Sequence, residues 1–245
     1  MLLVKRARQV PLLSSLRHRS FALLWLGQSL SRVGDAVLSV ALPWLVYDLT
    51  GSAMAMSSVA VLQRVPTLFL LLVGGVAVDR LPRQRVMLAS DAVQGLTVVL
   101  MAASIGSGHL QLWHLQVMAV VFGAAAAFFR PAFSSITPQL VPKDELISAN
   151  SLVSVSRSFA QVGGPLLGAG LVASGGIATA FAFDAATFGI SVLCLFAVPA
   201  IVSRAGLAGG ERPEWMAVRR VRKRALAVAG ARWRRVSGER SASYS

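Results

Sequence analysis

Six stretches of mainly apolar residues constrain the fold of this chain more than any other feature. They cover residues 21–46, 53–78, 86–106, 112–129, 152–173 and 177–201. An α-helix needs about 20 consecutive apolar residues to cross the hydrocarbon core of a bilayer, and each stretch has roughly that length. We therefore predict an all-α, polytopic membrane protein with six transmembrane helices in a lipid bilayer. Only 14% of the residues are charged, which excludes an ordinary soluble domain, whose share is about 25%.

The basic residues predict how these helices are oriented. Three of the connections contain no Lys or Arg: residues 47–52, 107–111 and 174–176. The segments that alternate with them hold five, three and two: residues 1–20, 79–85 and 130–151. Because Lys and Arg accumulate in cytoplasmic loops, this alternation predicts that both chain termini lie in the cytoplasm.

The same counts divide the chain into three parts. Residues 1–20 form a basic cytoplasmic N-terminus, residues 21–201 the six-helix bundle, and residues 202–245 a basic cytoplasmic tail with eleven Lys and Arg against three Glu. The tail is too polar to cross a bilayer. Two interpretations of it stay open: a solvated extension, or a helix that lies on anionic lipid headgroups. We expect no nucleic-acid partner.

Polar residues recur at helical spacing inside the apolar stretches. Gln28, Arg32, Asp35 and Ser39 are spaced 4, 3 and 4 apart, so they share one face of the first helix. A charge at mid-membrane depth costs about 2.5–3.5 kcal/mol on insertion scales, so it normally faces a cavity or a partner. This indicates a wet interior between the helices. Its candidate residues for transport or proton coupling are Arg32, Asp35, Arg64, Asp91 and Arg157.

Counting residues from the helix ends suggests which of these groups meet. Asp35 and Arg64 each lie 14 residues from the cytoplasmic end of their helix, so both reach the same depth. Arg32 competes for Asp35 from three residues away on the same helix. Two interpretations follow. The charges either only neutralise one another and fix the packing of two helices, or Asp35 exchanges a proton to which an arginine responds.

No enzymatic site competes with this interpretation. The three histidines are His18, His109 and His114, none of which has Cys, Asp or Glu around it at metal-binding spacing. There is one cysteine, Cys194, and no phosphate-binding glycine loop of the nucleotide-hydrolysing type. We therefore predict no catalytic residues, no metal and no cofactor.

The end of the second apolar stretch carries a motif that points to a family. Residues 74–85 read Gly-Gly-Val-Ala-Val-Asp-Arg-Leu-Pro-Arg-Gln-Arg. This resembles the loop between helices 2 and 3 of the major facilitator superfamily, with Pro82 in place of the usual Gly. The resemblance assigns a cytoplasmic gating motif to Gly75, Asp79, Arg80, Arg83 and Arg85.

Two further segments resemble exporters of that superfamily. Gly164, Pro165 and Gly168 are similar to its helix-5 packing motif, and a stripe of small residues at 160, 164 and 168 predicts close contact with another helix. Residues 129–132 and 149–152 resemble the loop between helices 4 and 5 in bacterial exporters of the siderophore and multidrug branch. The arginine typical of helix 4 in those exporters is replaced by Ala119.

The spacing of glycines suggests an internal repeat. Gly34 and the pair Gly74-Gly75 recur 89 residues later as Gly123 and Gly163-Gly164. If this is not a coincidence, the first three helices repeat in the last three with opposite direction, as in many transporter halves.

The resemblance implies proton-coupled efflux of a small amphiphilic molecule by alternating access, in a bacterial cytoplasmic membrane. It covers only the six-helix N-terminal half of a twelve-helix transporter. We therefore expect a second half-transporter or a homodimer as partner, and no transport by the chain alone, because Asp79 and the small-residue stripe would need surfaces of that partner. The alternative is a truncated, non-transporting membrane fragment or a membrane interaction protein.

Overall fold

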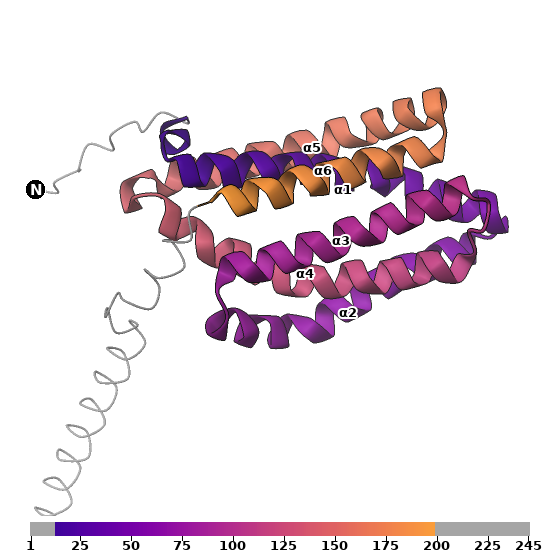
Figure 1. The fold of residues 1–245 in the computed structure, drawn as a ribbon, viewed down its shortest axis with the longest axis horizontal. Helices are drawn as coiled ribbons and strands as arrows, with labels where there is room; N and C mark the ends of the chain where they lie inside the picture. The colour runs from indigo at the N-terminus through magenta and orange to yellow at the C-terminus, as the bar shows by residue number, and fades with distance from the viewer. Residues whose placement is uncertain (1–12, 199–245) are drawn as a thin grey trace, which may run out of the picture. The chain divides into compact units, whose positions relative to one another are not determined.

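Six long helices run back and forth through the molecule (Figure 1). The computed structural model describes residues 13–198, except for the side chains of residues 72 and 76–80. The helices are α1 (Arg19–Thr50), α2 (Ala53–Arg80), α3 (Arg83–Gly106), α4 (Leu112–Leu140), α5 (Leu146–Gly175) and α6 (Ile177–Ala197). Two short 3-10 helices are η1 (Ser14–Arg17) and η2 (Lys143–Glu145). The described residues contain no strand, so the prediction of an all-α fold is confirmed.

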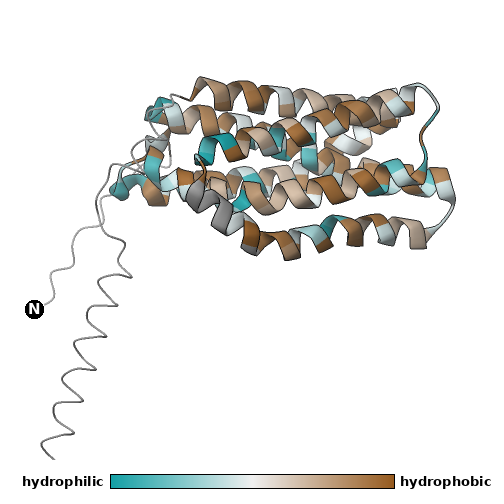
Figure 2. Cartoon of the chain, turned by 60° about the horizontal axis from the view of Figure 1, so that its bottom comes forward, coloured by the Kyte–Doolittle hydropathy of each residue, from teal (hydrophilic) through white to brown (hydrophobic). Residues whose placement is uncertain are grey.

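Five of the helices are long and apolar enough to cross a membrane. These are α1, α3, α4, α6 and the part of α2 from Ala53 to Leu71. α5 has 30 residues but is not among them. Figure 2 shows hydrophobic residues along the helices and hydrophilic ones gathered at one end. A membrane protein is thus confirmed, and the crossing by α5 stays a prediction.

Three glycine turns lie together at one end of the bundle, which we call the turn end (Figure 1). Gly51, Gly108 and Gly176 have φ values of 64°, 71° and 79°, and they are the only residues of the described part with positive φ. Such angles are strained for any residue with a Cβ. We call the opposite end, which holds Arg17, Arg83 and Lys143, the basic end.

The helix pairing has an internal symmetry. α1 packs against α5 and α6, α4 packs against α2 and α3, and α3 packs against α6. Exchanging α1 with α4, α2 with α5 and α3 with α6 leaves this set of pairs unchanged. The pairing is therefore consistent with the three-helix inverted repeat that the glycine spacing suggests.

Two apolar clusters fill the bundle, one toward each end. Along α1, the cluster at the basic end includes Leu24 and the cluster at the turn end begins at Val37. Along α3, the corresponding residues are Met87 and Val98. Buried polar side chains lie between the clusters or at the inner edge of the turn-end cluster: Gln28, Ser31, Ser90, Asp91, Gln94, Asp184, Thr187 and Ser191. The predicted polar interior therefore lies near the middle of the bundle.

α4 is longer than the sequence indicates. The apolar stretch ends at residue 129, but the helix continues to Leu140 through Pro131 and Pro138. The continuation buries Ala132, Ile136 and Leu140, which are spaced four apart and join the cluster at the basic end. This burial holds the helix together although each proline removes one backbone hydrogen bond. Arg130 consequently lies inside a helix rather than in a loop.

The small-residue stripe of α5 packs against α1. A Cβ added to Gly164 would overlap Ala36, and one added to Gly168 would lie 2.8 Å from the carbonyl oxygen of Val37. Pro165 lies between them without ending the helix. The prediction of a close helix contact is correct, but the expectation that a second half supplies the partner is wrong. The stripe is already covered by α1 of the same chain.

Candidate transport site

Two cavities meet in the polar section of the bundle. The larger, of about 730 Å³, extends toward the basic end and is lined by charged and polar side chains that include Arg32, Asp91 and Arg157. The smaller, of about 370 Å³, extends toward the turn end and is lined mainly by apolar side chains such as Leu42 and Met118. Both cavities share five lining residues: Asp35, Ser39, Gln94, Ala126 and Arg130.

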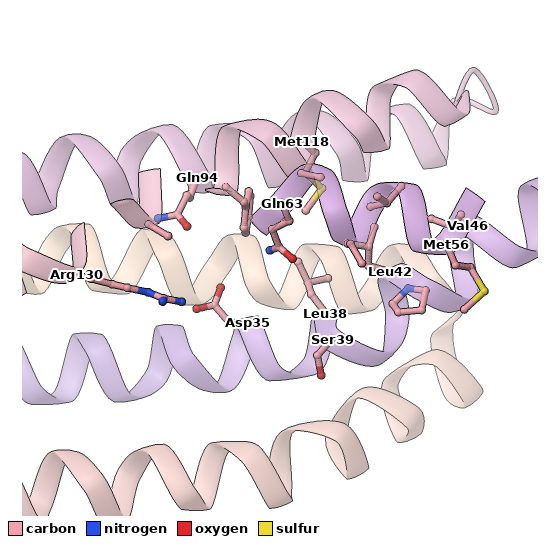
Figure 3. Close-up of a pocket in the computed structure, with 16 residues that line it drawn as sticks. Asp35, Leu38, Ser39, Leu42, Val46, Met56, Gln63, Gln94, Met118 and Arg130 are labelled. Atoms are coloured by element: carbon pink, nitrogen blue, oxygen red, sulfur yellow. The ribbon is translucent and has the colours of Figure 1, made fainter. Parts of the chain in front are cut away.

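Asp35 and Arg130 point toward one another where the cavities meet (Figure 3). Asp35 comes from α1 and Arg130 from α4, so the two charges face each other across the bundle. Asp35 is exposed to the cavities and forms no hydrogen bond or ion pair with the other described residues. Its carboxylate is therefore accessible from both cavities and faces an opposite charge (Figure 3).

Asp91 is held differently, in a buried network of three helices. Its Oδ2 accepts hydrogen bonds from Gln28 Nε2 at 2.9 Å and from Ser191 Oγ at 2.6 Å. Gln28 Nε2 also lies 2.8 Å from Ser191 Oγ. All three side chains are buried, so this network ties α1, α3 and α6 together at the wall of the larger cavity.

The two remaining arginines of the larger cavity come from α1 and α5. The Arg32 guanidinium lies 4.8 Å from the centre of the Phe133 ring, a cation–π contact. Its Nη1 is buried and has no hydrogen-bond partner among the described residues. Arg157 is exposed and lines the same cavity. The larger cavity is therefore lined by positive groups from α1 and α5 in addition to the negative Asp35.

Arg64 lies elsewhere. It is exposed on α2 and lines neither cavity, whereas its neighbour Gln63 faces the smaller one. Counting residues from the helix ends predicts the depth of Arg64, but it cannot tell on which side of a helix a residue lies. The structure therefore does not bring Arg64 to Asp35, and Arg130 takes that place. One signal in the sequence could have identified Arg130. The apolar residues Ala132, Ile136 and Leu140 are spaced four apart, which indicates that the helix continues past Arg130.

Among the side chains that the structure describes, no group of three or more His, Cys, Asp or Glu is positioned to hold a metal ion. The carboxylates at the cavities face arginines, glutamines and serines instead.

Comparisons with known proteins decide the family. A major facilitator superfamily model described as "Transmembrane secretion effector" matches residues 11–210. The chain belongs to this family. The chain is 33% identical over 178 residues to the multidrug efflux pump Tap of Mycobacterium tuberculosis, covering 69% of this chain and 42% of that protein. It is 28% identical over 152 residues to macrolide efflux protein A of Streptococcus pyogenes, covering 61% of this chain and 37% of that protein.

A third relative, the multidrug efflux pump Tap of Mycolicibacterium fortuitum, is 34% identical over 173 residues, covering 66% of this chain and 42% of that protein. The chain thus spans less than half the length of the curated relatives it matches. The resemblance to major facilitator exporters is confirmed. A membrane transport protein, rather than an enzyme, is what these relatives indicate.

The segment that the sequence predicts as a gating motif is partly described by the structure. Arg83 Nη1 donates a hydrogen bond to the Ser135 carbonyl oxygen at 3.0 Å, which joins the start of α3 to α4. Arg85 is exposed. A Cβ added to Gly75 would meet no atom within 4 Å. A Cβ added to the preceding Gly74 would overlap the Ala127 carbonyl oxygen. The close contact of α2 with α4 is therefore made by Gly74. Asp79 and Arg80 also belong to the predicted motif, and their side chains are outside the part of the chain that the structure describes.

Next to this motif, Gln84 contacts the end of α6. Its Nε2 donates to the carbonyl oxygens of Leu195 at 2.7 Å and Val198 at 2.9 Å. The last carbonyl groups of a helix have no partner within it, so this side chain caps them. Arg83 and Gln84 together fix the start of α3 to the ends of two other helices.

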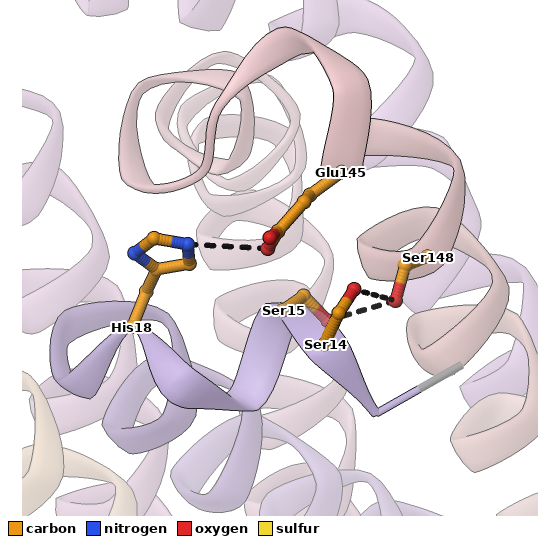
Figure 4. A network of polar contacts seen from close by, with 5 residues as sticks. All are labelled: Ser14, Ser15, His18, Glu145 and Ser148. Carbon is orange, nitrogen blue, oxygen red and sulfur yellow. Dashed lines mark hydrogen bonds and ion pairs between the residues drawn. The ribbon is translucent and has the colours of Figure 1, made fainter. Parts of the chain in front are cut away.

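The segment before α1 is attached to the start of α5 (Figure 4). His18 Nε2 and Glu145 Oε2 lie 3.1 Å apart, and no other acidic and basic side chains among those that the structure describes are this close. Ser148 Oγ lies 3.3 Å from the hydroxyl oxygens of both Ser14 and Ser15. The family's helical bundle is thus closed at its basic end by a contact between residues more than 120 positions apart in sequence.

Proposed function

We propose that this chain exports a small amphiphilic molecule across the bacterial cytoplasmic membrane by alternating access, in exchange for protons. The observation that carries the proposal is the position of Asp35, which lines both the polar and the apolar cavity and faces Arg130. The efflux functions in the names of the relatives support the same direction of transport.

The proposed coupling follows from the charge of Asp35. When its carboxylate is ionised, it attracts the Arg130 guanidinium and draws α1 toward α4. When it is protonated, the attraction is lost and Arg130 is released. Because Asp35 lies where the two cavities meet, proton binding changes the contact that separates them. A two-state element of this kind is what alternating access requires.

The cavity linings support an amphiphilic substrate. Leu38, Leu42 and Met118 provide an apolar surface for the body of the molecule in the smaller cavity. Gln94 and the charged groups where the cavities meet provide partners for a polar group. Pockets that are mostly apolar with a few placed polar groups are typical of small-molecule sites.

We also propose that a second six-helix unit, or a second copy of this chain, forms the other wall of the transport path. Several large apolar side chains of α2 and α5 are more than two-thirds exposed, and a partner or lipid has to cover them: Leu68, Phe69, Phe159, Val162 and Leu166. The chain's share of its relatives' length supports a further unit.

Reconstitution tests the function. We expect proton-driven efflux of a loaded amphiphilic dye from membrane vesicles of cells that express the gene. Liposomes with the purified chain alone then show whether the chain transports without a partner. If neither preparation exceeds empty vesicles, the transport proposal is wrong and the non-transporting interpretation replaces it.

The orientation is proposed from the alternation of basic residues, with the basic end, residues 1–20 and residues 202–245 in the cytoplasm. Fusions to an enzyme that is active only outside the membrane should give signal after Gly51, Gly108 and Gly175. Fusions after Pro82, Lys143 and Arg212 should give none. A reversed signal at any pair of neighbouring sites contradicts a six-span topology, including the crossing by α5.

The two arginines at the depth of Asp35 should differ in effect. Arg130→Gln should lower proton-driven efflux about tenfold or more, because it removes the positive charge that faces Asp35 (Figure 3); a tenfold change in rate corresponds to about 1.4 kcal/mol. Arg64→Gln should leave efflux nearly unchanged, since Arg64 lines neither cavity. Initial efflux rates, normalised to the amount of inserted protein, measure both. The opposite order would favour the pairing of Asp35 with Arg64.

A further inference from the structure

Asp184 is a carboxyl group that the transport site described above does not use. It lies on α6, is 0% exposed and lines neither of the two cavities. A Cβ added to Gly34 of α1 would overlap both Asp184 Oδ1 and Thr187 Oγ1. The carboxyl group is therefore pressed against the backbone of α1, immediately beside Asp35.

The hydrogen bonds around Asp184 account for only one carboxyl oxygen. Thr187 Oγ1 lies 2.8 Å from the Asp184 backbone oxygen and 3.3 Å from Oδ1, and Oδ2 is buried without a partner. A threonine hydroxyl has one proton to donate and can also accept. Its shorter contact uses that proton on the backbone oxygen. Oδ1 therefore receives at most a shared and weaker hydrogen bond from Thr187, whereas a protonated carboxyl group could itself donate to Thr187 Oγ1.

The surrounding charges do not stabilise an ionised form. α6 packs against α1, α3 and α5. From α1 the charge that reaches Asp184 is that of Asp35, which is also negative. Asp91 of α3 is engaged by Gln28 and Ser191, and Arg157 of α5 lines the larger cavity, which Asp184 does not. A buried carboxylate with an unpaired oxygen and a like charge nearby is costly, and proton binding removes that cost.

We propose that Asp184 holds a proton in this conformation and is a second proton-binding group of the transport cycle, freed when α1 and α6 separate at Gly34. This rests on the proposed proton-coupled function. In the packed state, the acid donates to Thr187 Oγ1 and is shielded by the Gly34 backbone. Separation of the two helices brings water to the carboxyl group, which then loses its proton to that water. Asp35 of α1 and Asp184 of α6 thus bind protons on either side of the contact that Gly34 makes between these two helices.

Infrared spectroscopy of the purified full chain in non-ionic detergent tests this proposal. The C=O stretching band of a protonated carboxyl group is separate from the bands of a carboxylate. At neutral pH we expect a band that Asp184→Asn removes, by the intensity of one carboxyl group. Asp48→Asn is the matched control, because Asp48 is an exposed aspartate at the turn end of α1, and it should leave the band unchanged.

Two further variants separate protonation from mere packing. Thr187→Val should keep the band but move it to higher frequency, because the acid loses its acceptor. Gly34→Ala should remove the band at neutral pH although Asp184 is present, because the added methyl group displaces the carboxyl group from α1. Size-exclusion profiles confirm that each variant is folded. A protonated-carboxyl band that Asp184→Asn leaves unchanged would show an ionised Asp184, and a band unchanged by Gly34→Ala would refute the release step.

These results are independent of transport. Suppose that vesicles show no proton-driven efflux, but the Asp184 band is present and Gly34→Ala removes it. The transport proposal then fails, and the protonation of buried Asp184 still stands. If efflux is proton-driven and Asp184→Asn leaves the infrared spectrum unchanged, the inference about Asp184 fails alone.

Discussion

Replacing Asp35 by Asn should reduce proton-driven efflux to the level of vesicles without the protein. Asn has nearly the same shape as Asp but cannot exchange a proton, and it cannot attract Arg130 as a carboxylate does. Asp35 makes no hydrogen bond with the other described residues, so the substitution removes no packing contact. The variant should therefore insert and accumulate like the unmodified protein.

Dye efflux from vesicles, with and without an imposed proton gradient, measures this effect. Asp48→Asn controls for the loss of one negative charge on the same helix, and it should transport normally. If Asp35→Asn instead abolishes insertion, and Arg130→Gln in the same chain restores it, then the pair is structural. The interpretation that the charges only fix helix packing would then replace the coupling role.

The second large effect is expected at Gly123, where α4 meets α2. A Cβ at this position would overlap the Gln63 carbonyl oxygen, and Thr67 Oγ1 donates to the Gly123 carbonyl oxygen at 2.8 Å. A backbone oxygen cannot rotate away as a side chain can, so Gly123→Ala has to push the two helices apart. Overpacking of this kind costs about 1–3 kcal/mol, more than the gain of up to about 1 kcal/mol from the helix propensity of Ala.

Unfolding in a detergent titration measures the stability of this variant. We expect the midpoint of Gly123→Ala to fall clearly below that of the unmodified chain. Gly170→Ala is the matched control, since it makes the same change in the middle of a helix with open space around it. It should be neutral or slightly stabilising. Equal midpoints for both variants would contradict the close contact between α2 and α4.

The positions of the helices could be predicted from the sequence because the bilayer imposes one length on every crossing segment. The stripe with Gln28 and Asp35 was predictable for a related reason, since polar side chains at helical spacing have to share one side and avoid lipid. Both features depend on periodicity and length along the chain. Neither needs knowledge of which helices become neighbours.

What the sequence could not provide were the neighbours themselves. Arg64 and Arg130 are both arginines near the depth of Asp35, and only the rotation and pairing of α2 and α4 decide which one faces it. The contact of Gly164 with Ala36 likewise depends on α5 lying beside α1. The end of α4 could not be predicted from the apolar stretch, which stops at residue 129, because buried contacts carry the helix on through the prolines at 131 and 138.

The helix pairing also has a consequence for how the protein is made. The main partners of α1, α2 and α3 are α4, α5 and α6, so the first three helices leave the ribosome before the surfaces they pack against exist. Asp91 enters the bilayer before Ser191, which later donates to its carboxylate, has been synthesised. During biogenesis, the polar side chains of the first three helices are therefore in the membrane before their partners. Arrest of translation before α6 should leave these helices accessible to insertion chaperones and membrane proteases.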